Sequence, residues 1–197
     1  MSGRYRPLAA PVAVKIVISG GFGVGKTTFV GAISEIEPLV TEAAMTEASI
    51  GIDDTSAVDG KTTTTVALDF GRITLDEDIL LYLFGTPGQD RFAFLWDDLV
   101  DGALGAIVMV DTRRIEDCFP ALDYFEDHGT PFLIAVNQFD NAARFDLQEV
   151  REALGLGPQV PMRYCDARQR ESVKQVLVAL TEEVATRRQA RRAVAAY

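Results

Sequence analysis

The sequence predicts a three-layer α/β fold, in which a mostly parallel sheet lies between two layers of helices. Two observations support this. Short, continuous apolar runs alternate with longer amphipathic segments, and a glycine-rich turn directly follows the first run. Continuous apolar runs are typical of strands that are buried on both faces, as in parallel sheets. Regular alternation of strands and helices indicates a sheet covered by helices on both sides.

The predicted strands differ in how continuous their apolar runs are. We expect buried strands at residues 13–19, 78–84, 103–110 and 131–137, with a weaker candidate at 159–164. Residues 64–73 alternate more between apolar and polar side chains, which predicts an edge strand. Residues 38–63 have no clear periodicity, and so long a loop in a compact domain is usually functional or mobile.

Amphipathic segments between these runs are the predicted helices, at about residues 26–36, 90–100, 115–128, 146–154 and 170–193. The last is the clearest, because apolar residues recur at helical spacing: Val173, Val176, Leu177, Leu180 and Val184. Asp146 and Glu149 have the spacing of a capping box, and Gly155 is a typical C-terminal stop.

Length and composition indicate one domain over residues 1–197, with 1–12 as an N-terminal extension and 187–197 as a basic helix end. The net charge of −10 disfavours nucleic-acid binding, because an acidic surface repels a phosphate polymer. No apolar run reaches the ~18 residues of a membrane span. Two cysteines cannot form a disulfide framework. We therefore expect a cytoplasmic protein.

A phosphate-loop pattern, Gly-Gly-Phe-Gly-Val-Gly-Lys-Thr-Thr, follows the first strand at residues 20–28. Glycines allow backbone N–H groups to turn inward around a phosphate, and the next helix adds its positive end. Lys26 can reach the β- and γ-phosphates, and the Thr27 hydroxyl can bind Mg²⁺. The pattern predicts a nucleoside triphosphate site formed by Gly21, Phe22, Gly23, Val24, Gly25, Lys26, Thr27 and Thr28.

A second motif, residues 137–140 (Asn-Gln-Phe-Asp), ends a predicted buried strand, where open α/β sheets bind ligands. The Asp140 carboxylate could accept hydrogen bonds from the N1–H and 2-amino groups of guanine, whereas adenine has neither donor there. Asn137 is expected to fix this loop. One strand later, at Asp166, Ala167 and Arg168, a backbone N–H could donate to the guanine O6, and that of Ala167 is the first candidate.

With these two motifs, the chain resembles the Ras-like small GTPases. Residues 84–92 (Phe-Gly-Thr-Pro-Gly-Gln-Asp-Arg-Phe) are similar to their second switch, and residues 65–70 to the first-switch threonine and its strand. The chain most resembles the bacterial Ras-like GTPases of conserved actinobacterial operons (conservons), and more distantly the gliding-motility GTPase. The resemblance implies a Ras-like G domain, a P-loop NTPase fold with a six-stranded sheet and an antiparallel edge strand at 64–73.

The resemblance also implies ligands, GTP or GDP with Mg²⁺, and roles for individual residues. Thr27 and Thr65 would hold the metal, with Thr64 as the alternative to Thr65. Gly88 would contact the γ-phosphate through its backbone, and Gln89 would orient the attacking water.

Three residues depart from the family pattern. Phe22 stands where a small residue usually lies against the γ-phosphate, so its ring could obstruct Gln89 or an arginine finger. Gly85 replaces the aspartate that supports Mg²⁺ through water, and Gln138 replaces the lysine whose stem covers the base. Together they predict slow unaided hydrolysis.

Two surfaces are candidates for partners. Phe92, Phe94, Leu95 and Trp96 occupy four of five positions, so at least one should be exposed for a partner. The candidates for partner contact are Phe92, Phe94 and Trp96, with core packing as the alternative for Phe92 and the expectation for Leu95. The resemblance implies a Roadblock-type regulator from the same operon. The arginines of the last helix (Arg187, Arg188, Arg191 and Arg192) are explained by solvation of a helix end, or by weak contact with anionic lipid; no lipid-anchor motif is evident.

Three functions are compatible with these motifs. The first is a GTPase switch in which water attacks the γ-phosphate in line, with electrostatic help from Lys26 and the metal. A regulator binds the GTP form and hydrolysis releases it, and a GTPase-activating or exchange partner is a further candidate. The second is a guanine-nucleotide-binding scaffold that barely hydrolyses, favoured by Phe22 and Gly85. The third is a P-loop kinase acting on a small molecule, for which no arginine-bearing lid is evident late in the chain.

Overall fold

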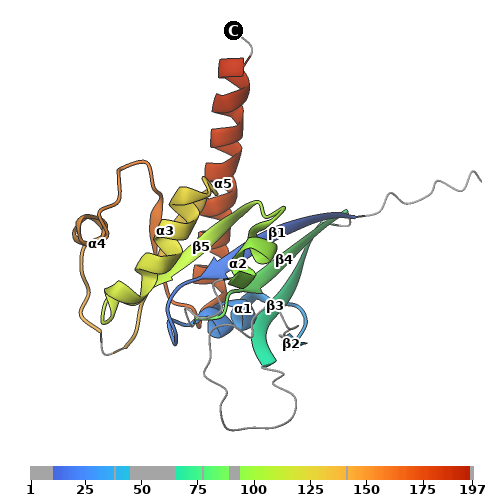
Figure 1. The fold of residues 1–197 in the computed structure, drawn as a ribbon, viewed down its shortest axis with the longest axis horizontal. Coiled ribbons are helices and arrows are strands. Elements are labelled where there is room, and N and C mark those ends of the chain that lie inside the picture. The colour runs from blue at the N-terminus through green and yellow to red at the C-terminus, as the bar shows by residue number, and fades with distance from the viewer. Residues whose placement is uncertain are drawn as a thin grey trace, which may run out of the picture.

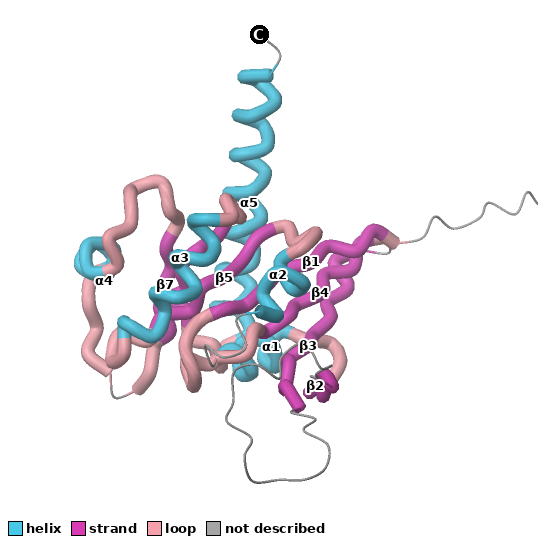
Figure 2. The backbone as a smooth tube through the Cα atoms, viewed as in Figure 1, coloured by secondary structure: helices cyan, strands magenta, loops and turns pink. Residues whose placement is uncertain are grey.

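The fold is a seven-stranded mixed sheet between two layers of helices, with both layers visible in Figure 1. The computed structural model describes residues 11–37, 39–44, 65–76, 78–88, 94–140 and 142–195. The strands are β1 (Val12–Ser19), β2 (Leu39–Ala44), β3 (Thr65–Asp76), β4 (Ile79–Gly85), β5 (Gly105–Val110), β6 (Phe132–Asn137) and β7 (Met162–Cys165). Their order is β2-β3-β4-β1-β5-β6-β7 (Figure 2).

The sheet confirms the predicted α/β class and its mostly parallel character. β4, β1, β5, β6 and β7 pair in parallel, and β3 runs antiparallel to both β4 and β2. The described sheet has one strand more than the six expected, because residues 39–44, assigned to a long loop, pair with β3. The edge position expected for residues 64–73 is therefore wrong: β3 is second in the sheet and β2 is the edge. Residues 45–64 lie outside the described part of the chain.

The helices are α1 (Lys26–Ile33), α2 (Trp96–Val100), α3 (Phe119–Asp127), α4 (Leu147–Ala153) and α5 (Arg170–Ala195), with a 3₁₀ turn, η3 (Ile115–Cys118), before α3. The single helix expected at 115–128 is divided because Pro120 stands in the first turn of α3, a position that needs no backbone donor. The expected helix at 90–100 is observed from Trp96, with residues 89–93 outside the described part. The predicted capping box of Asp146 and Glu149 is present at α4.

The core consists of two apolar clusters, one on each face of the sheet. Neighbouring strand residues alternate between them: Ile16 and Ile18 belong to the cluster under α1 and α5, and Val17 to the cluster under α3 and α4. The predicted α5 stripe from Val173 to Val184 is buried in the first cluster. Each fully buried large side chain contributes about 1.5–3 kcal/mol to the free energy of folding, so both helix layers are firmly held against the sheet.

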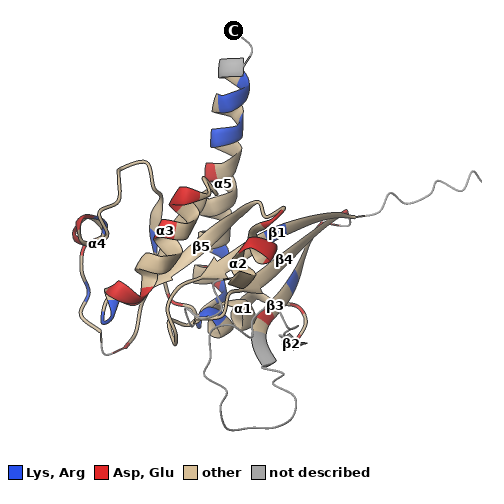
Figure 3. Cartoon of the chain, in the orientation of Figure 1, with Lys and Arg blue, Asp and Glu red and all other residues tan. Residues whose placement is uncertain are grey.

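α5 is longer than the sheet it covers. Its 26 residues span about 39 Å at the α-helical rise per residue. Its C-terminal turns project beyond the layers and carry basic side chains (Figure 3). None of the helices in the described part of the chain combines the length and apolarity needed to cross a bilayer.

Candidate nucleotide-binding site

The phosphate-loop residues connect β1 to α1 at the carboxyl edge of the sheet. Gly20 and Gly25 have left-handed backbone angles, with φ of 132° and 106°. A Cβ at Gly20 would collide with the carbonyl oxygen of Met109, and one at Gly25 would lie 2.8 Å from the Asn137 Nδ2 atom. The glycines are therefore required by backbone geometry and by close packing against β5 and β6, which brings the loop next to the ends of these strands.

Lys26 is buried at the start of α1, and its ammonium group points back into the loop. Its Nζ atom donates to the carbonyl oxygens of Gly20 at 2.7 Å and Gly21 at 2.8 Å. Burial lowers the pKa of Lys26 to about 8, an effect that the negative charge of Asp69 partly opposes. The loop thus holds a cation that is poorly solvated and free to exchange its carbonyl partners for phosphate oxygens.

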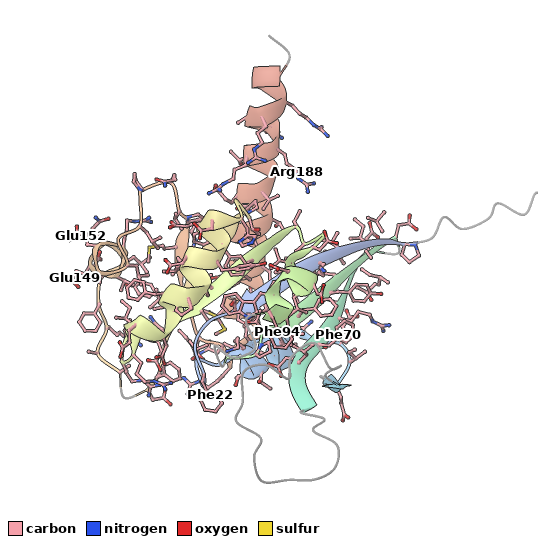
Figure 4. All side chains as sticks on the ribbon, viewed as in Figure 1. Phe22, Phe70, Phe94, Glu149, Glu152 and Arg188 are labelled. Carbon is pink, nitrogen blue, oxygen red and sulfur yellow. The ribbon has the colours of Figure 1, made fainter. Side chains whose placement is uncertain are left out.

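Gly88, from the predicted second switch, lies against the phosphate loop. A Cβ on Gly88 would come within 2.8 Å of both the Lys26 Nζ and the Phe22 Cα. The Phe22 side chain is 66% exposed and lies at the lower edge of the molecule in Figure 4. Gln89, predicted to orient water, lies outside the described residues. The structure therefore brings Gly88 to the phosphate loop.

The Thr27 hydroxyl donates a hydrogen bond to Asp69 Oδ2 at 2.8 Å. Thr65 is the first residue of β3, but its side chain is not described, and Thr64 is outside the described part. Of the predicted metal ligands, only the Thr27 side chain is therefore placed. Sequence reasoning missed Asp69 completely. The available signal was a glycine at position 85, directly opposite Asp69 in the ladder of β3 and β4.

Asn137 joins the phosphate loop to the loop after β7. Its side chain is 6% exposed, its Nδ2 donates to the Val24 carbonyl at 2.8 Å, and its Oδ1 accepts from the Ala167 backbone N–H at 3.1 Å. The Ala167 N–H, predicted to donate to a base, thus donates to Asn137 here. The neighbouring Gln138 is half-buried, and its backbone N–H donates to the Cys165 carbonyl at 2.7 Å.

The exposed Asp140 carboxylate is held by Arg168. Arg168 Nη1 donates to Asp140 Oδ2 at 2.6 Å, and Nη2 donates to Oδ1 at 2.9 Å. Arg168 also bonds Asp166, which lowers the pKa of Asp166 to about 2. The hydrogen bonds from Arg168 likewise hold the pKa of Asp140 below its ordinary value. Asp140, Asp166 and Arg168 therefore meet, with Asp140 ionised and both of its oxygens bonded to Arg168.

These residues border a cavity of about 310 Å³ that extends from the phosphate loop to the base loop. Gly23, Gly25 and Thr28 border one part, and Asn137, Asp140 and Arg168 another. A pocket of this size is within the range of small-molecule sites, and nucleotide phosphates and base would occupy its two ends.

Two arginines after β5, which sequence reasoning did not identify, buttress the site. The Arg113 guanidinium lies 3.8 Å from the centre of the Phe139 ring and pairs with Asp111 at 2.7 Å. Arg114 Nη2 donates to the Phe22 carbonyl at 2.8 Å. Both contacts depend on the strand order, which places the end of β5 between the two loops, and no local sequence pattern reports them.

The predicted partner surface is only partly exposed. Phe94 is 48% exposed, and Figure 4 shows it near α2. Trp96 is only 6% exposed and packs edge-on against Tyr124, with ring centres 5.1 Å apart. Its assignment to a partner surface is therefore wrong, because α2 turns this ring into the core. Phe92 lies outside the described residues.

The strand order and the glycine loop between β1 and α1 define the nucleotide-binding P-loop fold of G domains. The FeoB G-domain from Methanococcus jannaschii has a similar structure, with a TM-score of 0.57 and 16% identity over 88% of this chain and 98% of that one. The cytosolic domain of the Thermotoga maritima FeoB iron transporter in a GDP form gives a TM-score of 0.63 and 18% identity over 89% and 65% of the two chains. At these identities the likeness shows the fold alone.

A family described as "Conserved hypothetical ATP binding protein" matches residues 18–187, and the chain belongs to this family. A curated relative, Uncharacterized protein MJ1339 of Methanocaldococcus jannaschii, is 33% identical over 132 residues, which cover 64% of this chain and 71% of the relative. The family match over residues 18–187 includes both the phosphate loop and the base loop.

Proposed function

We propose that this protein is a guanine-nucleotide switch that binds GTP and GDP with Mg²⁺, hydrolyses GTP slowly and binds partners according to the nucleotide. The observation that carries the proposal is the Asn137 side chain, which holds the phosphate loop against the loop after β7, whose Arg168 pairs with Asp140. This arrangement sets a polyphosphate-binding loop and a base-reading carboxylate at a fixed spacing in one pocket.

The contacts of Asp140 support the choice of guanine. Its two oxygens accept a parallel pair of N–H donors from Arg168. The N1–H and 2-amino groups of guanine form the same kind of parallel pair, so guanine can replace the Arg168 fork without reorienting the carboxylate. Adenine has an acceptor at N1 and no 2-amino group, so it offers the carboxylate no donors and cannot replace the Arg168 fork.

The family description mentions ATP, so base choice is the first property to test. We expect Asp140→Ala to reduce the preference for GDP over ADP by roughly 5- to 150-fold, because a bidentate pair discriminates by about 1–3 kcal/mol. Competition of each nucleotide against a fluorescent GDP analogue measures this preference.

The matched control is Asp123→Ala, which removes an exposed acid on α3, away from the site. An unchanged preference in Asp140→Ala, or an ADP preference in the wild-type protein, would contradict the assignment of guanine.

The Thr27 hydroxyl and the Asp69 carboxylate provide hard oxygen donors of the kind that Mg²⁺ prefers. When bound, Mg²⁺ would neutralise charge on the β- and γ-phosphates. Lys26 would bind the same oxygens, Gly88 would contact the γ-phosphate, and Gln89 would orient water for in-line attack. Thr65 would complete the metal site.

Slow hydrolysis is proposed from Phe22 and Gly85. Phe22 puts a large exposed ring on the phosphate loop, and its backbone lies against Gly88, so the ring would compete for the space that an arginine finger or Gln89 needs. A scaffold with almost no intrinsic hydrolysis is the second candidate, favoured by the same ring. Single-turnover hydrolysis with and without a partner separates the two, since a chemical step that appears only with the partner supports the switch.

The partner is proposed to be a Roadblock-type regulator encoded beside this gene, as in conserved-operon GTPases. The exposed Phe94 is the described residue best placed to meet it. Phe94→Ala should weaken nucleotide-dependent binding of that regulator at least fivefold, measured by calorimetry, whereas Val178→Ala, on the exposed surface of α5, should not. If both substitutions weaken binding equally, Phe94 is not part of the interface.

A further inference from the structure

The carboxylate of Asp69 reaches the first turn of α1 from a neighbouring strand. It accepts a hydrogen bond from the Thr27 hydroxyl at 2.8 Å, although β3 is separated from β1 in the sheet by β4. A hydroxyl has one proton and two lone pairs. Because the hydroxyl hydrogen of Thr27 points to Asp69, the lone pairs of the Thr27 oxygen can face a cation on the nucleotide side.

The position of Asp69 depends on the absence of a side chain at Gly85. The two residues stand directly opposite each other in the antiparallel ladder of β3 and β4. A Cβ on residue 85 would lie 2.9 Å from both the Cβ and the Oδ2 of Asp69. Because Gly85 has no side chain, the Asp69 side chain can occupy this space.

We propose that Asp69 is the positioning residue for the cation that accompanies the nucleotide, supplying from β3 the carboxylate that β4 lacks at Gly85. Mg²⁺ keeps several waters in protein sites, and these waters need acceptors in addition to the ligand itself. Asp69 fixes the direction of the Thr27 hydroxyl and provides a carboxylate for such waters. The inference rests on the proposed function, since it concerns the cation of the same nucleotide site.

The test measures how much Mg²⁺ is needed to slow release of a fluorescent GDP analogue from the full chain. Asp69→Asn keeps the shape of the side chain and removes its charge. We expect the half-effective Mg²⁺ concentration to rise 10- to 100-fold, the usual cost of losing an outer-shell partner. The release rate in EDTA should stay within about twofold of the wild-type rate, because Asp69 is proposed to act through the cation.

Glu35→Gln is the matched control, because Glu35 also bonds β3, at the Thr74 N–H (3.0 Å), at the other end of the strand. A second variant, Asp69→Gly with Gly85→Asp, moves the acid to β4 and should restore the Mg²⁺ requirement to within a few fold of the wild-type value. Gly85→Asp alone should not show the wild-type Mg²⁺ requirement, because the side chains of residues 69 and 85 cannot both occupy that space.

The outcomes separate the two ideas. If Asp69→Asn needs the same Mg²⁺ as the wild type, or if Glu35→Gln shifts equally, the role of Asp69 is overturned while nucleotide binding stands. If Asp69→Asn does not fold, the double variant Asp69→Gly with Gly85→Asp decides. The role of Asp69 is then overturned if Mg²⁺ does not slow release of the GDP analogue from this variant. If the wild-type protein binds neither guanine nor adenine nucleotides, the proposed function itself fails.

Discussion

At the scale of single residues, the site combines polar groups that water would otherwise stabilise. Lys26 is the clearest case: its ammonium is buried, and within the described part of the chain two loop carbonyls replace its hydration. Burial disfavours the charged form, which is why the pKa of Lys26 falls to about 8 rather than remaining near its ordinary value. A bound polyphosphate would favour the charged form and reverse this effect.

The affinity for GDP should therefore depend on pH. Below pH 8 the free protein carries the charged Lys26 and affinity is full. As pH rises through 8, free Lys26 loses its proton and must regain it on binding, so affinity should fall by up to about tenfold per pH unit. Titration of GDP from pH 6.5 to 9.5 measures the slope. Lys26→Ala should bind weakly with a flat profile, and a flat wild-type profile would contradict the role of Lys26.

The sequence predicted residues whose pattern is local, and the structure brings them to one edge of the sheet; it missed contacts that depend on strand register. The phosphate loop follows from glycine spacing, and Asn137 and Asp140 follow from their place after a buried strand. Asp69 contacts Thr27 only because β3 pairs with β4, and 42 residues separate the two in sequence. Trp96 was misassigned because apolar crowding does not show which ring turns inward.

At the scale of elements, helix ends follow from sequence more closely than sheet edges do. The Asp146 side chain accepts from the Gln148 N–H at 2.8 Å, and the Glu149 side chain accepts from the Asp146 N–H at 2.9 Å. These reciprocal bonds use local geometry alone. β2, in contrast, was missed because a short segment with little apolar pattern becomes a strand only through pairing with β3.

Asp146→Ala should lower the free energy of unfolding by about 1 kcal/mol, because the Gln148 N–H at the start of α4 loses its side-chain acceptor. The expected fall in melting temperature is about 2–4 °C for a chain of this size. Thermal unfolding followed by circular dichroism measures it. Asp123→Ala, at an exposed position on α3, should lower the melting temperature much less. Equal decreases in the two variants would show that the capping box does not stabilise the protein.

At the scale of the whole molecule, the sheet brings two loops that are distant in sequence into contact with one buried side chain. Asn137 lies 113 residues from Val24 and 30 residues from Ala167, and it bonds both. The Asn137 side chain thus links the phosphate loop directly to the loop after β7. The predicted α/β class and the parallel centre of the sheet were confirmed because buried strands have a strong sequence pattern.

Asn137→Ala should affect stability and binding together. It leaves the Val24 carbonyl and the Ala167 N–H without their partner, and each buried unpaired group costs about 1–3 kcal/mol. We expect a melting temperature at least 4 °C lower and weaker affinity for GDP, measured on the same samples. A stable variant with normal affinity would show that the two loops are positioned independently.

The close approach between positions 69 and 85 also has an evolutionary consequence. A Cβ at position 85 would lie 2.9 Å from the Asp69 Cβ, so this strand pair can accommodate one acidic side chain but not two. Homologues that share the pairing should thus carry the acid at one position or the other, with glycine opposite. A motif search that scores position 85 alone would discard such chains as incapable of holding a metal, whereas one that scores the two positions jointly would retain them.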